Sequence, residues 1–108
     1  MPGRVTTHKH FLTALQTLKP KFRKALLKVC SEEEINCICE CIHNVLKGNI
    51  PLQNKDSIKL RKHKSTLRKL VSKGKHQFRK HIIIQKGGAF LPIILGSVLT
   101  GLINSILR

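Results

Sequence analysis

The sequence predicts an all-α protein with a small helical domain, a long basic amphipathic helix and a C-terminal apolar helix. Apolar residues recur at intervals of three and four residues through the first half of the chain. A helix-capping signature, Ser31 followed three positions later by Glu34, marks one helix start. The net charge of +16 is concentrated in the middle third, where apolar and basic residues fall on opposite helix faces.

Charge divides the 108 residues into three segments. Residues 51–86 hold twelve of the 21 Lys and Arg residues with one acid, whereas residues 87–108 hold only Arg108. We therefore expect an N-terminal helical bundle in 1–50, a basic helical segment in 51–86 and an apolar helix in 87–108. A chain of this length is enough for one small domain. A bundle this small would also gain stability by burying apolar surface in a homo-oligomer.

Three helices are predicted in the first segment. The stretch HFLTALQTL has Leu12 and Leu15 at helical spacing, and a second helix follows Pro20. The predicted core face of this second helix comprises Phe22, Ala25, Leu26 and Val29.

The third helix begins after Ser31 and ends before Gly48, which is placed as a C-cap. Three glutamates in its first turn suit the positive end of the helix dipole. Its apolar stripe comprises Ile35, Ile38, Ile42, Val45 and Leu46. This stripe should pack against the two preceding helices.

The basic segment predicts one helix from about Gln53 to Ser72, with a break at Gly74 and a basic extension after it. Leu60, Leu67, Leu70 and Val71 gather on one face. The candidate ligands of nucleic acid are the cations Lys55, Lys59, Arg61, Lys62, Lys64, Arg68, Lys69, Lys73, Lys75, Arg79 and Lys80.

So dense a positive charge predicts a polyanionic partner. The chain has no Trp, no Tyr and four Phe, which disfavours recognition by stacking on exposed bases. Dense, repeated cations suit phosphates rather than base edges, so we expect sequence-independent binding to double-stranded DNA. The stretch KLRKHK also resembles a nuclear import signal.

The stretch CICECIH contains four residues able to bind zinc: Cys37, Cys39, Cys41 and His43. On a helix Cys39 points roughly 160° away from both other cysteines, so one tetrahedral site cannot collect all four. We expect small buried hydrophobic residues here, with no metal and no other cofactor. A site formed by Cys30 with Cys37 and Cys41, or an intermolecular disulfide, is the alternative.

Enzymatic motifs are missing from the sequence: it has no GxSxG, no HExxH and no Gly-rich phosphate loop. Three of its five acids suit the start of one helix without any catalytic role. No apolar run near the N-terminus resembles a secretory signal, and we expect reduced thiols in the cytosol or nucleus. A binding protein is therefore predicted rather than an enzyme.

Ala89 to Leu107 carry no charge. A helix from Leu91 to Leu107 would be roughly 25 Å long, slightly short of the roughly 30 Å hydrocarbon core of a bilayer. The tail, residues 89–108, therefore predicts a weak membrane span, an interfacial or bilayer-disrupting helix, or a self-packing element. Alternatively, it closes the core of the N-terminal bundle.

The order of a basic run, Gly87-Gly88 and FLPIILGSVLTGLI resembles the precursor of adenovirus core protein X, also called mu. The longer pattern of KPKFRKALL, CECIHNVLKGNIPL and KLRKHKSTLRKL resembles the X-like proteins of adintoviruses and Polinton (Maverick) elements, over nearly the whole chain. The resemblance implies a virion protein that condenses double-stranded DNA and acts in the host nucleus. It also implies processing at Gly87 and Gly88 by a viral cysteine protease, although Gln85 stands where that protease prefers Met, Ile or Leu.

Three hypotheses of function follow. The first is a viral or virus-derived core protein that binds and condenses duplex DNA through the basic helix. The second is a membrane-active protein that uses the basic helix and residues 89–108 on bilayers. The third is a host-domesticated regulator whose helical domain binds a partner protein.

Overall fold

The computed structural model describes the backbone of residues 4–72 and 76–107, and the side chains of residues 6–72 and 77–101. Helices make up nearly all of these residues, and no strand occurs among them, which confirms the all-α prediction. The helices are α1 (Arg4–Thr7), α2 (Lys9–Thr17), α3 (Pro20–Val29), α4 (Glu32–Leu46), α5 (Asn54–Arg61), α6 (Lys64–Val71) and α7 (His76–Leu107).

The capping predictions for α4 are confirmed. Ser31 Oγ accepts from the Glu34 N–H at 3.1 Å, and Glu34 Oε1 accepts from the Ser31 N–H at 2.9 Å. Gly48 follows the helix with a φ of 77°, a conformation that costs glycine little. Ile35, Ile38 and Ile42 are fully buried, so the apolar stripe faces the core as predicted, except that Leu46 at its end is 37% exposed. The predicted packing partners were wrong, because α4 packs mainly against α7 and α6 and not against the two helices that precede it, α2 and α3.

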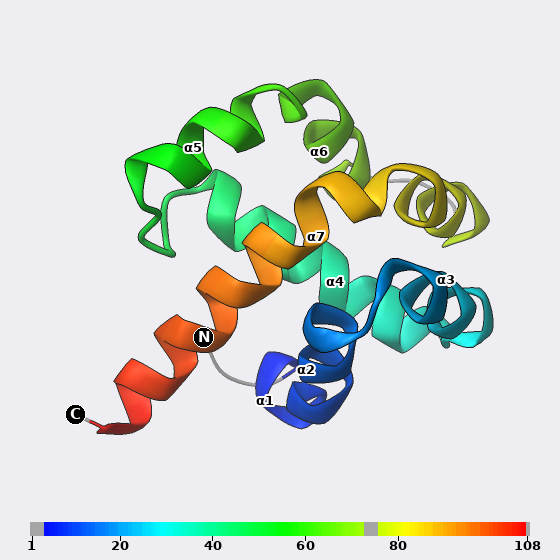
Figure 1. Cartoon of the computed structure of the whole chain (residues 1–108), viewed down its shortest axis with the longest axis horizontal. Helices are drawn as coiled ribbons and strands as arrows, with labels where there is room; N and C mark the ends of the chain where they lie inside the picture. Colours follow the sequence, from blue (N-terminus) through cyan, green and yellow to red (C-terminus); the bar gives the residue numbers. More distant parts are fainter. Residues whose placement is uncertain (1–3, 73–75, 108) are drawn as a thin grey trace.

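Helix α7 crosses the middle of the molecule, with α5 and α6 on one side and α1 to α3 on the other (Figure 1). It packs against α2, α4 and α3, and its side chains complete the core formed by the earlier helices. The buried residues that α7 contributes are Ile83, Phe90, Leu91, Ile94, Leu95, Val98 and Leu99. Up to residue 101, the apolar tail therefore closes the core, which was one of the alternatives predicted for it.

Segments that differ in charge thus share one core. The radius of gyration is 12.9 Å, close to the roughly 13 Å of a single compact domain of about 100 residues. Buried leucines of the basic segment, Leu60, Leu67 and Leu70, join the cluster formed by the N-terminal helices and α7. The charge boundaries at residues 50 and 86 therefore do not separate independent hydrophobic cores.

Two helix boundaries differ from the prediction. The single helix expected from about Gln53 to Ser72 is two helices, α5 and α6, with a break at Lys62 and His63. The basic extension expected after Gly74 forms the first turns of α7 from His76 onward. The apolar helix therefore begins well before the Gly-Gly pair.

The predicted core face of α3 was largely wrong, because only Leu26 of its four residues packs against the core. Phe22 is 55% exposed and Val29 is 78% exposed, whereas Leu27 and the long side chain of Arg23 are buried. Arg23 Nε donates to the Leu15 carbonyl at 2.7 Å, and Nη2 donates to the Leu18 carbonyl at 3.1 Å. These bonds satisfy carbonyls at the end of α2, and this rotates α3 so that the Arg23 side of the helix faces inward.

Gly87 and Gly88 lie inside α7 and do not interrupt it. Gly87 is buried and Gly88 is exposed. Four residues after Gly88, Pro92 has no N–H to donate to the Gly88 carbonyl, and the ribbon of α7 curves along its length (Figure 1). The predicted junction between basic part and tail is therefore continuous helix in this structure.

The two glycines give a matched test of this helix. A methyl group added at Gly88 would meet no atom within 4 Å, whereas one added at Gly87 would lie 2.9 Å from Leu91 Cδ1. We expect Gly88→Ala to raise the free energy of unfolding by about 0.5–1 kcal/mol, because alanine favours the helix interior. Gly87→Ala should raise the free energy of unfolding by less, because the Leu91 side chain must move to make room for the added methyl group. Thermal unfolding measures both, and a destabilising Gly88→Ala would contradict a continuous helix.

Removing a buried side chain from α7 tests whether the tail closes the core. Leu95 is fully buried, so Leu95→Ala should lower the free energy of unfolding by about 2–5 kcal/mol. Ala89 on the same helix is exposed, and Ala89→Ser should change it by less than about 0.5 kcal/mol. Urea unfolding followed by circular dichroism distinguishes the two. Equal effects would show that α7 is not packed as described.

Candidate nucleic-acid interface

The break between α5 and α6 creates an open hollow on the basic surface. Its volume is about 640 Å³, and residues from the end of α5 and along α6 line it. The lining residues are the cations Arg61, Lys62, Lys64, Arg68 and Lys69 with the hydroxyl residues Ser65 and Ser72. Five of the predicted DNA ligands therefore surround one concave surface, which we call the cationic hollow.

Packing beneath the hollow holds the two helices at the break. His63, between α5 and α6, is half-buried, and its ring lies 5.9 Å from the ring of Phe90 in α7. Leu60 before the break and Leu67 and Leu70 after it are buried in the core. Because these apolar residues point inward, the intervening cations are left on the outer side.

The surface around the cationic hollow carries mostly positive charge. Lys55, Lys59 and the five cations of the hollow are all exposed, as the sequence predicted. Asp56 is the one acidic residue in the sequence from 51 to 86. The first turn of α6 has no acidic residue, and His63 before it makes no side-chain capping bond. The arrangement favours groups with several negative charges.

Arg79 and Lys80 differ from the other predicted ligands because both are half-buried. Arg79 Nη2 donates to the carbonyl of Ser72, the C-cap residue of α6. Lys80 Nζ donates at 3.2 Å to the carbonyl of Cys30, the C-cap residue of α3. Their charges therefore cap helix ends within the fold. The predicted ligands Lys73 and Lys75 lie outside the described residues.

The four cysteines are buried, which confirms the prediction for Cys39 and Cys41. Burial raises the pKa of Cys30 and of Cys39, although the positive charge of Arg79 partly offsets the rise at Cys39. The hydrogen bond with Cys37 and then burial raise the pKa of Cys41. These three thiols are therefore neutral at physiological pH and poor nucleophiles.

In the ranges that the structure describes, no three His, Cys, Asp or Glu side chains lie close enough to hold a metal ion.

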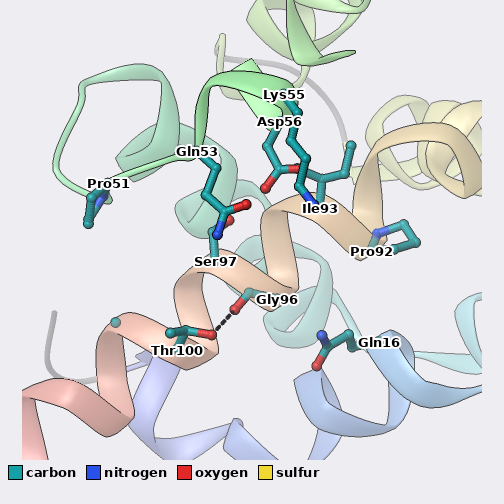
Figure 2. Close-up of a pocket in the computed structure, with 11 residues that line it drawn as sticks. Gln16, Pro51, Gln53, Lys55, Asp56, Pro92, Ile93, Gly96, Ser97 and Thr100 are labelled. Atoms are coloured by element: carbon teal, nitrogen blue, oxygen red, sulfur yellow. Dashed lines mark hydrogen bonds between the residues drawn. The ribbon is translucent and has the colours of Figure 1, made fainter. Parts of the chain in front are cut away.

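A second cavity, of about 450 Å³, lies where the segment after Pro51 meets α7 and α2 (Figure 2). The side chains of Gln53, Lys55 and Asp56 face this region from one side, and Gln16 borders it from α2. Thr100 donates to the Gly96 carbonyl at 2.8 Å on its floor. Because one cation and one carboxylate stand next to each other at its edge, this cavity has no net preference for anions. The cationic hollow is the stronger candidate.

Two features of the interface were missed by the sequence analysis. The first is the break at Lys62 and His63, which makes the surface concave. The second is the packing of the His63 ring against Phe90. The sequence did contain a signal of this packing, because His63 falls three residues after Leu60 and four before Leu67, on the apolar face. A histidine on that stripe indicated a packed side chain rather than another phosphate ligand.

No protein-family model, no curated protein and no solved structure matches the chain.

Proposed function

We propose that the protein binds double-stranded DNA without sequence preference, using the cationic hollow together with Lys55 and Lys59 of α5. The observation that supports this most strongly is the gathering of five exposed cations around one concave surface. Phosphates of a duplex backbone present repeated negative charge at a spacing that neighbouring helix side chains can follow. Stacking on unpaired bases is disfavoured because the sequence has no Trp and no Tyr, and the closely repeated cations suit phosphates rather than base edges.

The setting that we propose is a viral or virus-derived particle, with the protein condensing DNA in the virion and entering the host nucleus. This part rests on the resemblance to adenovirus core protein X and to the X-like proteins of adintoviruses and Polintons. Processing by a viral cysteine protease at Gly87 and Gly88 remains part of the proposal. Since both glycines lie within α7, cleavage there would first require the helix to open locally.

The salt dependence of binding tests the interface. If all seven exposed cations of α5 and α6 contact phosphates, the slope of log K against log salt should approach about −6. Replacing two of them in Arg68→Gln/Lys69→Gln should reduce the magnitude of the slope by about 2 and leave the fold intact. Fluorescence anisotropy with a labelled duplex measures this.

Arg79→Gln/Lys80→Gln is the matched control, because it removes the same charge from half-buried positions. It should leave the slope nearly unchanged and lower the free energy of unfolding by about 1–3 kcal/mol, since carbonyls at two helix ends lose their donors. If the two double variants gave equal slopes of log K against log salt, the cationic hollow would not be the DNA interface. A hundredfold preference for one duplex sequence would contradict non-specific binding.

Membrane activity is the second candidate, favoured by one observation. Gln77–Gly101 in α7 is long and apolar enough to cross a bilayer, by length and composition. In the structure the apolar face of this helix is packed into the core, so insertion would require α7 to leave α2 and α4. Release would expose at least the seven apolar side chains that are buried between residues 77 and 101 of α7, and this loss of burial is its energetic cost.

A variant in α2 tests this candidate without altering α7. Leu15 is fully buried, so Leu15→Ala should loosen the core and favour release of α7. If α7 acts on bilayers, Leu15→Ala should release more dye from anionic vesicles than the unaltered chain. Thr13→Ala, an exposed change on the same helix, should match the unaltered chain. Absence of leakage with all three would exclude membrane disruption by α7.

A further inference from the structure

An apolar groove lies beside the cationic hollow, between the end of α4, the segment after Pro51, and helices α5 and α6. Its volume is about 280 Å³. The apolar side chains that line it are Val45, Leu46, Leu52, Leu60 and Leu67. Leu46 is 37% exposed there, although the sequence pattern predicts it as a core residue. Leu46 and the half-buried Leu52 therefore keep apolar surface in contact with water, whereas Val45, Leu60 and Leu67 are buried beneath them.

The size of the groove limits what it can hold. Small-molecule sites usually have volumes of roughly 300–1,000 Å³ and bury most of their ligand. This groove is smaller and open, so it suits one or two apolar anchor side chains of a peptide, with the peptide backbone outside. A whole helix face could not enter it.

Charge indicates which peptide would fit. Arg61 and Lys64 border the groove, and both are exposed. A second copy of this chain is disfavoured as the occupant, because each copy carries a net charge of +16 and the two would repel. An acidic segment with apolar anchors would complement both the floor and the rim.

The same two cations also line the cationic hollow. We propose that the groove binds an acidic protein segment through one or two apolar anchors, and that this segment and a DNA duplex exclude one another because both require Arg61 and Lys64. An acidic partner would then keep the protein from nucleic acid until the two are separated. The exclusion, unlike the peptide binding, rests on the proposed DNA binding.

A fluorescent peptide rich in Asp and Glu, with two central leucines, serves as the probe, and its serine-substituted version is the control. At about 0.15 M salt, exposed charges farther apart than about 8 Å are largely screened, and the leucine peptide should bind at least tenfold more tightly than the serine peptide. Equal affinities would mean attraction by charge alone and would overturn the groove as a site.

Two exposed aliphatic residues, Leu46 in the groove and Ile58 outside it, give matched variants. Leu46→Asn should lower the affinity for the leucine peptide about tenfold and leave the affinity for duplex DNA unchanged. Ile58→Asn changes a residue that is 56% exposed and does not line the groove, so it should affect neither ligand. Circular dichroism verifies that both variants fold. Equal losses of peptide binding from the two variants would overturn the proposal.

Competition tests the exclusion separately. The leucine peptide should displace labelled duplex from the full chain, and its affinity should be about tenfold lower in the variant Arg61→Gln/Lys64→Gln. A complex containing peptide and duplex together would overturn the exclusion while leaving the peptide site intact. Peptide binding by a chain that binds no duplex would overturn the DNA proposal alone.

Discussion

The packing of α7 against α2 and α4 is the interaction on which the rest of the structure depends. Among the side chains of α7 that the structure describes, seven large apolar ones are buried, and burying each is worth about 1.5–3 kcal/mol. This favourable energy opposes the self-repulsion of a chain with a net charge of +16. Phe90 of α7 also contacts His63, so the same helix fixes the break that makes the basic surface concave. The apolar end of the sequence thus positions its basic middle.

Cations serve two different purposes in this fold. Arg23, Arg79 and Lys80 donate to carbonyls at the ends of α2, α6 and α3, where the negative end of each helix favours a positive charge. The exposed cations of α5 and α6 make no such contact with carbonyls among the bonds described, and they face solvent together. Residue type alone does not distinguish these two groups of cations. They differ in their burial and in whether a helix end lies within reach of the side chain.

Local signals were therefore more predictable than long-range ones. The capping box of α4 and the stripe of Ile35, Ile38 and Ile42 follow from neighbours in sequence, and the structure has both. The orientation of α3 could not be predicted, because it depends on Arg23 reaching the end of another helix. Likewise, Arg79 and Lys80 resemble the exposed cations in sequence, and only their contacts with Ser72 and Cys30 distinguish them.

The same balance of forces links binding to folding. Repulsion among the exposed cations of α5 and α6 acts against the leucines that anchor these helices, since Leu60, Leu67 and Leu70 lie on their inner face. A bound polyanion removes that repulsion without altering the core. Because a ligand that binds only the folded state stabilises it in proportion to the logarithm of its concentration over Kd, nucleic acid or an acidic partner should stabilise the whole fold. If the proposed partners bind there, the repulsion within the cationic surface opposes folding of the free protein and is neutralised in the complex.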